Sequence, residues 1–99
     1  MAVSLSQAAD HVTASDQELV VAARDGDRAA FGELYHRYVR MVHGVLLAAV
    51  APDVTDDLLQ DVFLKAMTQL CHLRNDTHFG GWIAAIARNR AVDYYRRSR

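Results

Sequence analysis

The stretch FGELYHRYVRMVHGVLLAA, residues 31–49, places apolar side chains three or four positions apart along its whole length. That spacing puts them on one face of an α-helix, because the helix has about 3.6 residues per turn. The charged residues Glu33, Arg37 and Arg40 fall largely on the other side. The stretch therefore predicts one long amphipathic helix, with the apolar face Phe31, Leu34, Tyr35, Tyr38, Val42, Val45, Leu46 and Ala49.

Local signals mark the ends of this helix and of a shorter one before it. The sequence SDQE, residues 15–18, matches a capping box and predicts a helix start after Ser15. The short helix should end at Asp25–Gly26, where glycine suits the exit. Asp27 can cap the long helix, and Pro52 marks its end or the turn just after it.

Two further helices follow. The third is expected to start at Asp53 or Thr55, with an apolar stripe after it. Residues 73–78 are polar apart from Leu73 and predict a loop. The last helix should begin near residues 77–79 and run to about Arg97. Four helices in 99 residues predict an all-α fold, a compact bundle. The stripe of the third helix is Leu58, Leu59, Val62, Phe63, Ala66, Met67 and Leu70.

Glycines at positions 80 and 81 stand at the expected start of the last helix. Paired glycines weaken a first helical turn or let another chain approach closely.

Length and composition narrow the class of protein. With 99 residues and 52% hydrophobic residues, the chain predicts one globular domain. We expect a flexible leader over residues 1–15 and the domain over residues 16–99. The single cysteine, Cys71, excludes an internal disulfide and fits a cytoplasmic protein. The longest apolar run, residues 45–51, is far shorter than the roughly 20 residues that span a bilayer.

No group of residues predicts catalysis. No serine has a credible base beside it, and no glycine-rich phosphate loop occurs. Cys71, His72 and His78 have a spacing that fits no structural zinc pattern. We therefore expect a protein that is not an enzyme and that uses neither a metal nor a cofactor.

Charge is distributed unevenly. Residues 1–78 contain six basic and eleven acidic residues, whereas residues 79–99 contain five arginines and one aspartate. An acidic body with a basic end suggests two different partners, one of which could be a nucleic acid. The alternative is an arginine-rich helix end that only aids solubility and suits the helix dipole.

The basic segment, residues 79–99, carries a second pattern. On a helix, Trp82, Ile86, Asn89 and Asp93 share one face, and Ile83 and Ala87 adjoin it. The helix could bury its isoleucines and present an aromatic ring, an amide and a carboxylate at the margin. Rings stack on bases, amides and carboxylates read base edges, and arginines hold phosphates. In the alternative interpretation, Trp82 is simply a core residue. The flanking arginines are Arg88, Arg90, Arg96 and Arg97.

Three segments resemble extracytoplasmic-function (ECF) sigma factors. WIAAIARNRAVDYYRR, residues 82–97, is similar to the family pattern W-L-x-x-I-A-x-N-x-x-x-D-x-x-R-R. DDLLQDVFLKAM, residues 56–67, resembles D-L-x-Q-E-x-F-L-x-A-W, and residues 16–38 resemble the family's opening two helices. Together they cover residues 16–99 in the family's order. The resemblance is to region 2, the promoter-melting domain, and we expect the family's second DNA-reading domain, region 4, to be absent from this chain.

The resemblance implies two binding surfaces. The third helix would dock on the clamp coiled coil of the β′ subunit of RNA polymerase. The last helix and the loop before it would melt the minus-ten promoter element and capture bases of the non-template strand, with Asn89 in the base pocket. The implied polymerase-binding residues are Asp57, Leu58, Gln60, Asp61, Phe63 and Lys65. The predicted DNA-binding residues are Leu73, Trp82, Arg88, Asn89, Arg90, Asp93, Arg96 and Arg97, with Arg99 as a further backbone contact.

Leu73 departs from the family pattern, because relatives often have an aromatic residue there. The family also implies an anti-sigma factor that covers the same surfaces. Two other functions stay open: a helix-turn-helix regulator that places its last helix in duplex DNA, and a protein-interaction module that binds no DNA. Binding to single strands or to duplex would separate them.

Overall fold

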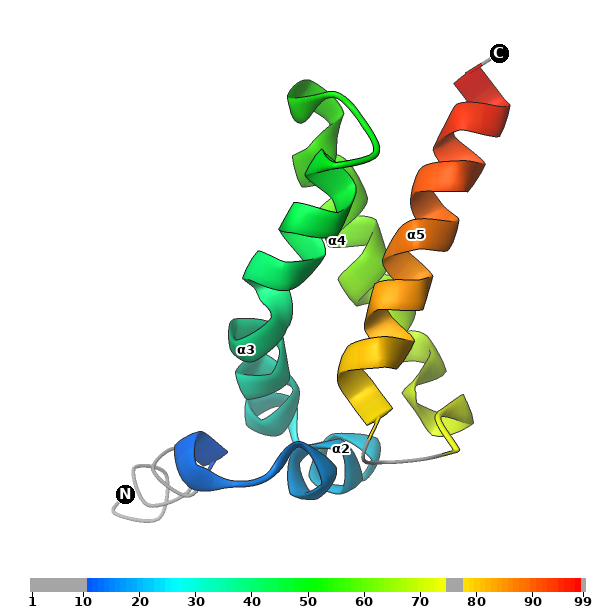
Figure 1. Ribbon diagram of the computed structural model, residues 1–99. Coiled ribbons are helices and arrows are strands. Elements are labelled where there is room, and N and C mark those ends of the chain that lie inside the picture. The colour runs from blue at the N-terminus through cyan, green and yellow to red at the C-terminus, as the bar shows by residue number, and fades with distance from the viewer. Residues whose placement is uncertain (1–10, 75–77, 99) are drawn as a thin grey trace.

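The computed structural model describes residues 11–74 and 78–98, and over these ranges the ordered elements are helices. They are α2 (Asp16–Arg24), α3 (Arg28–Leu47), α4 (Pro52–Gln69), the 3-10 turn η1 (Leu70–His72) and α5 (Phe79–Ser98). Figure 1 shows α3, α4 and α5 as three long helices, with the short α2 lying across one end of them. The predicted all-α class is confirmed.

The predicted caps are confirmed. The Ser15 hydroxyl accepts a hydrogen bond from the Glu18 N–H (3.1 Å), and the Glu18 carboxylate accepts one from the Ser15 N–H (2.8 Å). The N–H of Ser15, which donates to the carboxylate, is the main cause that lowers the pKa of Glu18. Gly26 has a φ of 98°, which glycine adopts without strain. Asp27 accepts a hydrogen bond from the Ala30 N–H (3.1 Å) at the start of α3, and this bond lowers the pKa of Asp27.

The predicted start of the third helix is wrong by a few residues. Helix α4 begins at Pro52, and its N-cap Ala51 makes no side-chain cap. Proline suits the first helical position, because its fixed φ fits the helix and its missing N–H is not needed there. Thr55 is fully buried in the first turn, where its hydroxyl donates to the Ala51 carbonyl (3.0 Å).

The core takes side chains from every helix, largely those of the predicted stripes. Tyr35 and Met67 were predicted to be apolar-face residues, yet both are exposed. They lie at the edges of their stripes, where α3 and α4 no longer cover them; the Tyr35 ring still packs edge-on against Phe63, with 4.7 Å between ring centroids. The fully buried large side chains are Leu19, Val20, Leu34, Val42, Leu46, Thr55, Val62, Phe79 and Ile83.

The end of the predicted leader is part of the fold. The Arg37 guanidinium donates to the backbone carbonyls of His11 (3.1 Å), Val12 (3.1 Å) and Ala14 (2.6 Å). The same group pairs with Asp16 (2.9 Å) and Glu33 (2.9 Å). Residues 11–15 are therefore fixed against α3, whereas residues 1–10 lie outside the described residues.

Helices α3 and α5 pack closely together at Gly80. A Cβ atom on Gly80 would lie 2.9 Å from Cε1 of Tyr38, whereas one on Gly81 would meet nothing within 4 Å. The Tyr38 ring also packs against Phe79, and its hydroxyl donates to Asp16. Burial, together with this bond, raises the pKa of Tyr38 to about 12, so the hydroxyl stays protonated at neutral pH. At Gly80 the missing side chain thus leaves room for Tyr38 of the same chain.

Alanine at these two positions should change stability in opposite directions. Gly80→Ala should destabilise the domain by up to about 2 kcal/mol, because overpacking costs about 1–3 kcal/mol and the gain in helix propensity returns about 1 kcal/mol. Gly81→Ala should stabilise it by up to about 1 kcal/mol. Urea unfolding followed by circular dichroism would measure both. Equal shifts of the same sign would show that Tyr38 gives way freely.

Candidate nucleic-acid interface

Helix α5 turns its apolar face to the core, as predicted. Ile83, Ile86 and Ala87 are buried, whereas Arg88 and Asn89, on the next turn, are exposed. Arg90 is partly covered, because its side chain extends along the neighbouring α4. The helix therefore anchors through its first half and presents polar groups through its second half.

A hollow of about 450 Å³ lies between α4 and the second half of α5. It brings together five of the eight residues predicted to bind DNA. It also contains Lys65, which was predicted to contact polymerase. Cations, an amide and a carboxylate thus meet in one open space. The lining residues are Lys65, Asn89, Arg90, Val92, Asp93, Arg96 and Arg97.

Ion pairs connect the two helices at this hollow. Arg90 donates to Asp61 of α4 through Nη2 (3.0 Å) and Nε (3.3 Å), and its Nη1 lies 3.5 Å from Asp93. Asp93 also pairs with Arg97 (3.4 Å). The carboxylates therefore offset part of the positive charge of α5.

Other polar groups at the hollow are not engaged in this way. Within residues 11–74 and 78–98, Lys65 and Arg96 at the hollow have no carboxylate partner within 4 Å, and neither has Arg88 outside it. In the same ranges, the Asn89 amide makes no side-chain hydrogen bond. Asparagine has weak propensity for a helix interior. Because the Asn89 amide is exposed and is not used by the fold in these ranges, it can bind a ligand without loss of stability.

Three predicted DNA-binding residues do not line the hollow. Leu73 is buried, and its backbone carbonyl accepts a hydrogen bond from Arg24; its side chain thus faces the core. Trp82 is half-buried and packs against Phe79, with 5.8 Å between ring centroids. Arg88 is exposed on another side of α5. Arg99 and residues 75–77 of the predicted loop lie outside the described residues.

The predicted polymerase-binding residues divide into two groups. Asp57, Gln60, Asp61 and Lys65 are exposed on α4, as expected. Leu58 and Phe63 are only 3% and 5% exposed, because both belong to the apolar stripe of α4. In the free domain Leu58 packs beneath the helix, and Phe63 lines the floor of a groove between α3 and α4; their contact with polymerase stays a prediction.

An apolar part of the same surface was missed. Leu64 is 53% exposed and Met67 is 54% exposed, beside the exposed Tyr35. They border a groove of about 530 Å³ between α3 and α4. Leu64 follows Phe63 directly and so falls outside the buried stripe, which is a signal that the sequence already contained.

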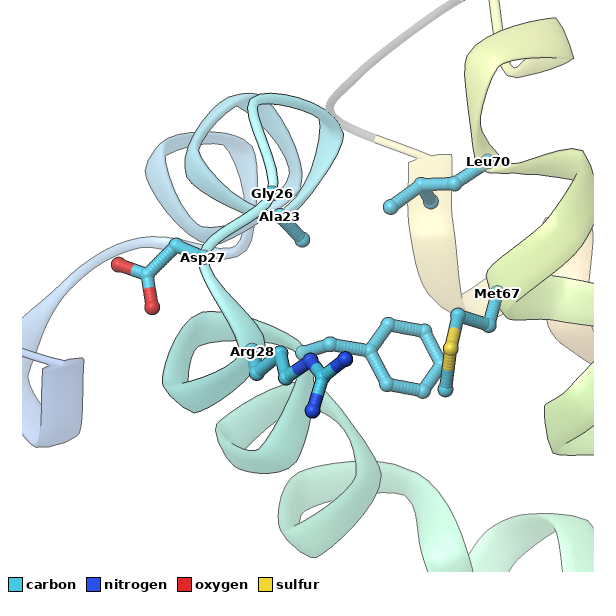
Figure 2. A pocket seen from close by; sticks show the side chains of 7 residues that line it. Ala23, Gly26, Asp27, Arg28, Met67 and Leu70 are labelled. Atoms are coloured by element: carbon cyan, nitrogen blue, oxygen red, sulfur yellow. The ribbon is translucent and has the colours of Figure 1, made fainter.

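A second hollow continues this groove at the α2–α3 turn. Its volume is about 410 Å³, and it shares Arg28, Phe31 and Met67 with the groove. Figure 2 shows Arg28 extending toward Met67, whereas the carboxylate of Asp27 points away. The hollow therefore continues an apolar surface and has no arrangement of acid, base and nucleophile. The remaining lining residues are Ala23, Gly26, Asp27 and Leu70.

Among the described residues, no three His, Cys, Asp or Glu side chains form a group that could hold a metal ion. No helix within those ranges is long and apolar enough to cross a membrane.

The fold is an all-α bundle with an open hollow lined by cations, an amide and a carboxylate, and comparison with known proteins shows the family of this chain. The family model for Sigma-70 region 2 matches residues 34–99. The chain is 35% identical over 94 residues to the ECF RNA polymerase sigma factor BldN of Streptomyces coelicolor, covering 93% of this chain and 36% of that protein.

Two further ECF sigma factors are similar to this chain over most of its length. The ECF RNA polymerase sigma-E factor of Haemophilus influenzae is 35% identical over 80 residues, 81% of this chain and 42% of the relative. The ECF RNA polymerase sigma factor SigM of Mycobacterium tuberculosis is 35% identical over 86 residues, 86% of this chain and 44% of the relative. The chain belongs to the Sigma-70 region 2 family, in its ECF branch, whose members are transcription initiation factors and not enzymes. It spans less than half the length of these relatives.

Proposed function

We propose that this chain directs RNA polymerase to promoters by two contacts. The exposed face of α4 docks on the clamp coiled coil of the β′ subunit. The hollow between α4 and α5 captures bases of the non-template strand at the minus-ten element. The observation that carries the proposal is this hollow, where the unpartnered amide of Asn89 lies among cations from two helices.

The roles follow from the chemistry of the side chains. The Asn89 amide both donates and accepts hydrogen bonds, so it can pair with the edge of an unstacked base. Lys65 and Arg96 hold phosphates on either side. The half-exposed Trp82 ring offers a stacking surface at the start of α5. No cofactor enters this mechanism.

The free energies of base opening and of base binding show what such a domain can do without polymerase. Opening a base pair and flipping a base costs a few kcal/mol. Stacking returns about 1–3 kcal/mol per base, and a matched base edge adds about 1–3 kcal/mol of discrimination. These terms are comparable, so the domain tips an opening that polymerase already favours and does not drive it unaided.

Two features support polymerase as the protein partner. The relatives are named as RNA polymerase sigma factors. The face of α4 combines the polar Asp57, Gln60 and Asp61 with the exposed, apolar Leu64, which is the mixture of a protein-binding surface. The domain would act in the cytoplasm with polymerase, and an anti-sigma factor would block it by covering this face.

Asn89→Ala tests base capture. Fluorescence anisotropy of labelled single strands with a randomised minus-ten segment, with and without core polymerase, should show sequence-selective binding by the wild type. The variant should lose about 5- to 100-fold in base discrimination, the equivalent of about 1–3 kcal/mol, while keeping salt-sensitive binding. Gln17→Ala removes an exposed amide from α2 and should change nothing.

The other outcomes identify the competing functions. Equal, salt-sensitive binding to every strand and to duplex would reduce the basic end to a charge patch. A preference for duplex would favour the helix-turn-helix regulator. No binding to DNA, even with polymerase present, would leave a protein-interaction module.

A further inference from the structure

One chain of ion pairs links the two proposed surfaces. Asp61 stands on the α4 face that is proposed to meet polymerase, and its side chain is 49% exposed. Its partner Arg90 belongs to the hollow proposed to meet DNA. The pair joins residues 29 positions apart in the sequence, at 3.0 Å and 3.3 Å. Asp93 continues the chain to Arg97.

In this arrangement Arg90 is occupied. Its Nε and Nη2 groups face one carboxylate oxygen of Asp61, and its Nη1 group lies near Asp93. These are the donors with which a guanidinium holds a phosphate in a bidentate manner. Arg90 therefore cannot offer its Nε/Nη2 edge to a phosphate while Asp61 holds that edge. An ion pair as exposed as this one is weak, so exchange of Asp61 for another partner is easy.

Resting on the proposed function, we propose that Arg90 is a phosphate-binding residue. In the free domain Asp61 holds the guanidinium of Arg90, and docking of polymerase at Asp61 releases it. A cationic or hydrogen-bonding group of polymerase that takes the Asp61 carboxylate frees the guanidinium of Arg90. The freed side chain then adds one positive charge to the hollow. Binding of polymerase and binding of DNA thereby favour each other, because such coupling is reciprocal.

Asp61→Asn in the free domain should imitate the release. Its affinity for a single-stranded minus-ten oligonucleotide should rise by about 2- to 5-fold, the range that corresponds to an exposed ion pair. The plot of log affinity against log salt concentration should steepen by about 0.7, the value for one more phosphate contact on a single strand. Fluorescence anisotropy over a range of salt concentrations measures both quantities.

Asp57→Asn is the matched control. Asp57 lies one helical turn before Asp61 on the same exposed face, and among the described residues it takes part in no ion pair. Its replacement removes the same charge from the domain without freeing Arg90. Affinity should therefore rise less than for Asp61→Asn, and the salt slope should stay that of the wild type.

The variant Arg90→Gln completes a double-mutant cycle with Asp61→Asn. In that background Asp61→Asn should no longer raise affinity or the salt slope, because no guanidinium remains to be released. If Asp61→Asn matches Asp57→Asn in affinity and salt slope, the ion pair between Asp61 and Arg90 only holds α4 against α5, and the proposal is overturned. A gain that persists with Arg90→Gln would overturn it as well.

Comparison of Asp61→Asn with Asn89→Ala distinguishes failure of this proposal from failure of the proposed base capture. If Asn89→Ala abolishes base discrimination while Asp61→Asn changes nothing, only the release of Arg90 fails. If Asn89→Ala has no effect with core polymerase present, base capture itself fails. Reciprocity gives a last check: the oligonucleotide should tighten binding of the wild type to core polymerase more than binding of Arg90→Gln.

Discussion

Phe79→Ala is expected to lower the free energy of unfolding by about 3–5 kcal/mol, as for other buried phenylalanines. Phe79 is the first residue of α5 and is fully buried. Its ring packs between Tyr38 and Trp82, at centroid distances of 5.3 Å and 5.8 Å. Removing it leaves a cavity where α5 meets α3. Urea unfolding followed by circular dichroism would give the change.

Such a loss is a large part of the stability of a small domain, which is about 5–15 kcal/mol in total. Tyr95→Ala is the matched control, since Tyr95 is an exposed aromatic residue on the same helix. It should change stability by no more than about 0.5 kcal/mol. If the two variants unfold alike, α5 is not anchored through Phe79.

Arg37→Ala should cost about 2–3 kcal/mol, because it removes charge-assisted hydrogen bonds that are partly shielded from solvent. Burial acts to lower the pKa of Arg37, but the hydrogen bonds that Arg37 donates to the carboxylates of Glu33 and Asp16 outweigh it and raise that pKa, so the group stays charged. Its loss would leave two carboxylates and the carbonyls of residues 11–14 without their donor. Chemical unfolding would measure the cost, and hydrogen exchange would show freed amides near residues 11–15.

Arg40→Ala on the same helix supplies the control, because Arg40 is exposed. It should stay within about 0.5 kcal/mol of the wild type. Arg37→Lys should restore only part of the loss, since an ammonium cannot reproduce the fork of guanidinium donors. Full recovery with lysine would mean that charge alone matters at this position.

The sequence predicted what depends on near neighbours. The capping box at Ser15, the glycine exit at Gly26 and the cap at Asp27 involve partners within a few positions, so local chemistry decides them. The apolar stripes were correct except at Tyr35 and Met67, because burial follows helical period. The start of α4 was wrong because polar capping residues were preferred over Pro52, although proline fits the first helical position equally well.

The site depended on contacts that no local pattern contains. Lys65 and Arg90 meet in one hollow only because α4 and α5 pack together, and the pair of Arg90 with Asp61 spans 29 positions. The family pattern also does not distinguish an exposed residue from a supporting one. Leu58 and Phe63 therefore entered the predicted docking surface, although the stripe that contains them is buried.

The contacts of Arg37 set the limits of the smallest piece of this chain that should fold independently. The family match starts at residue 34, inside α3. A fragment cut at that residue would lack α2, and with it Leu19 and Val20, which are fully buried. A fragment cut at residue 16 would keep those side chains but lose the carbonyls of residues 11–14 that Arg37 holds. Recombinant versions of this domain should therefore begin no later than His11.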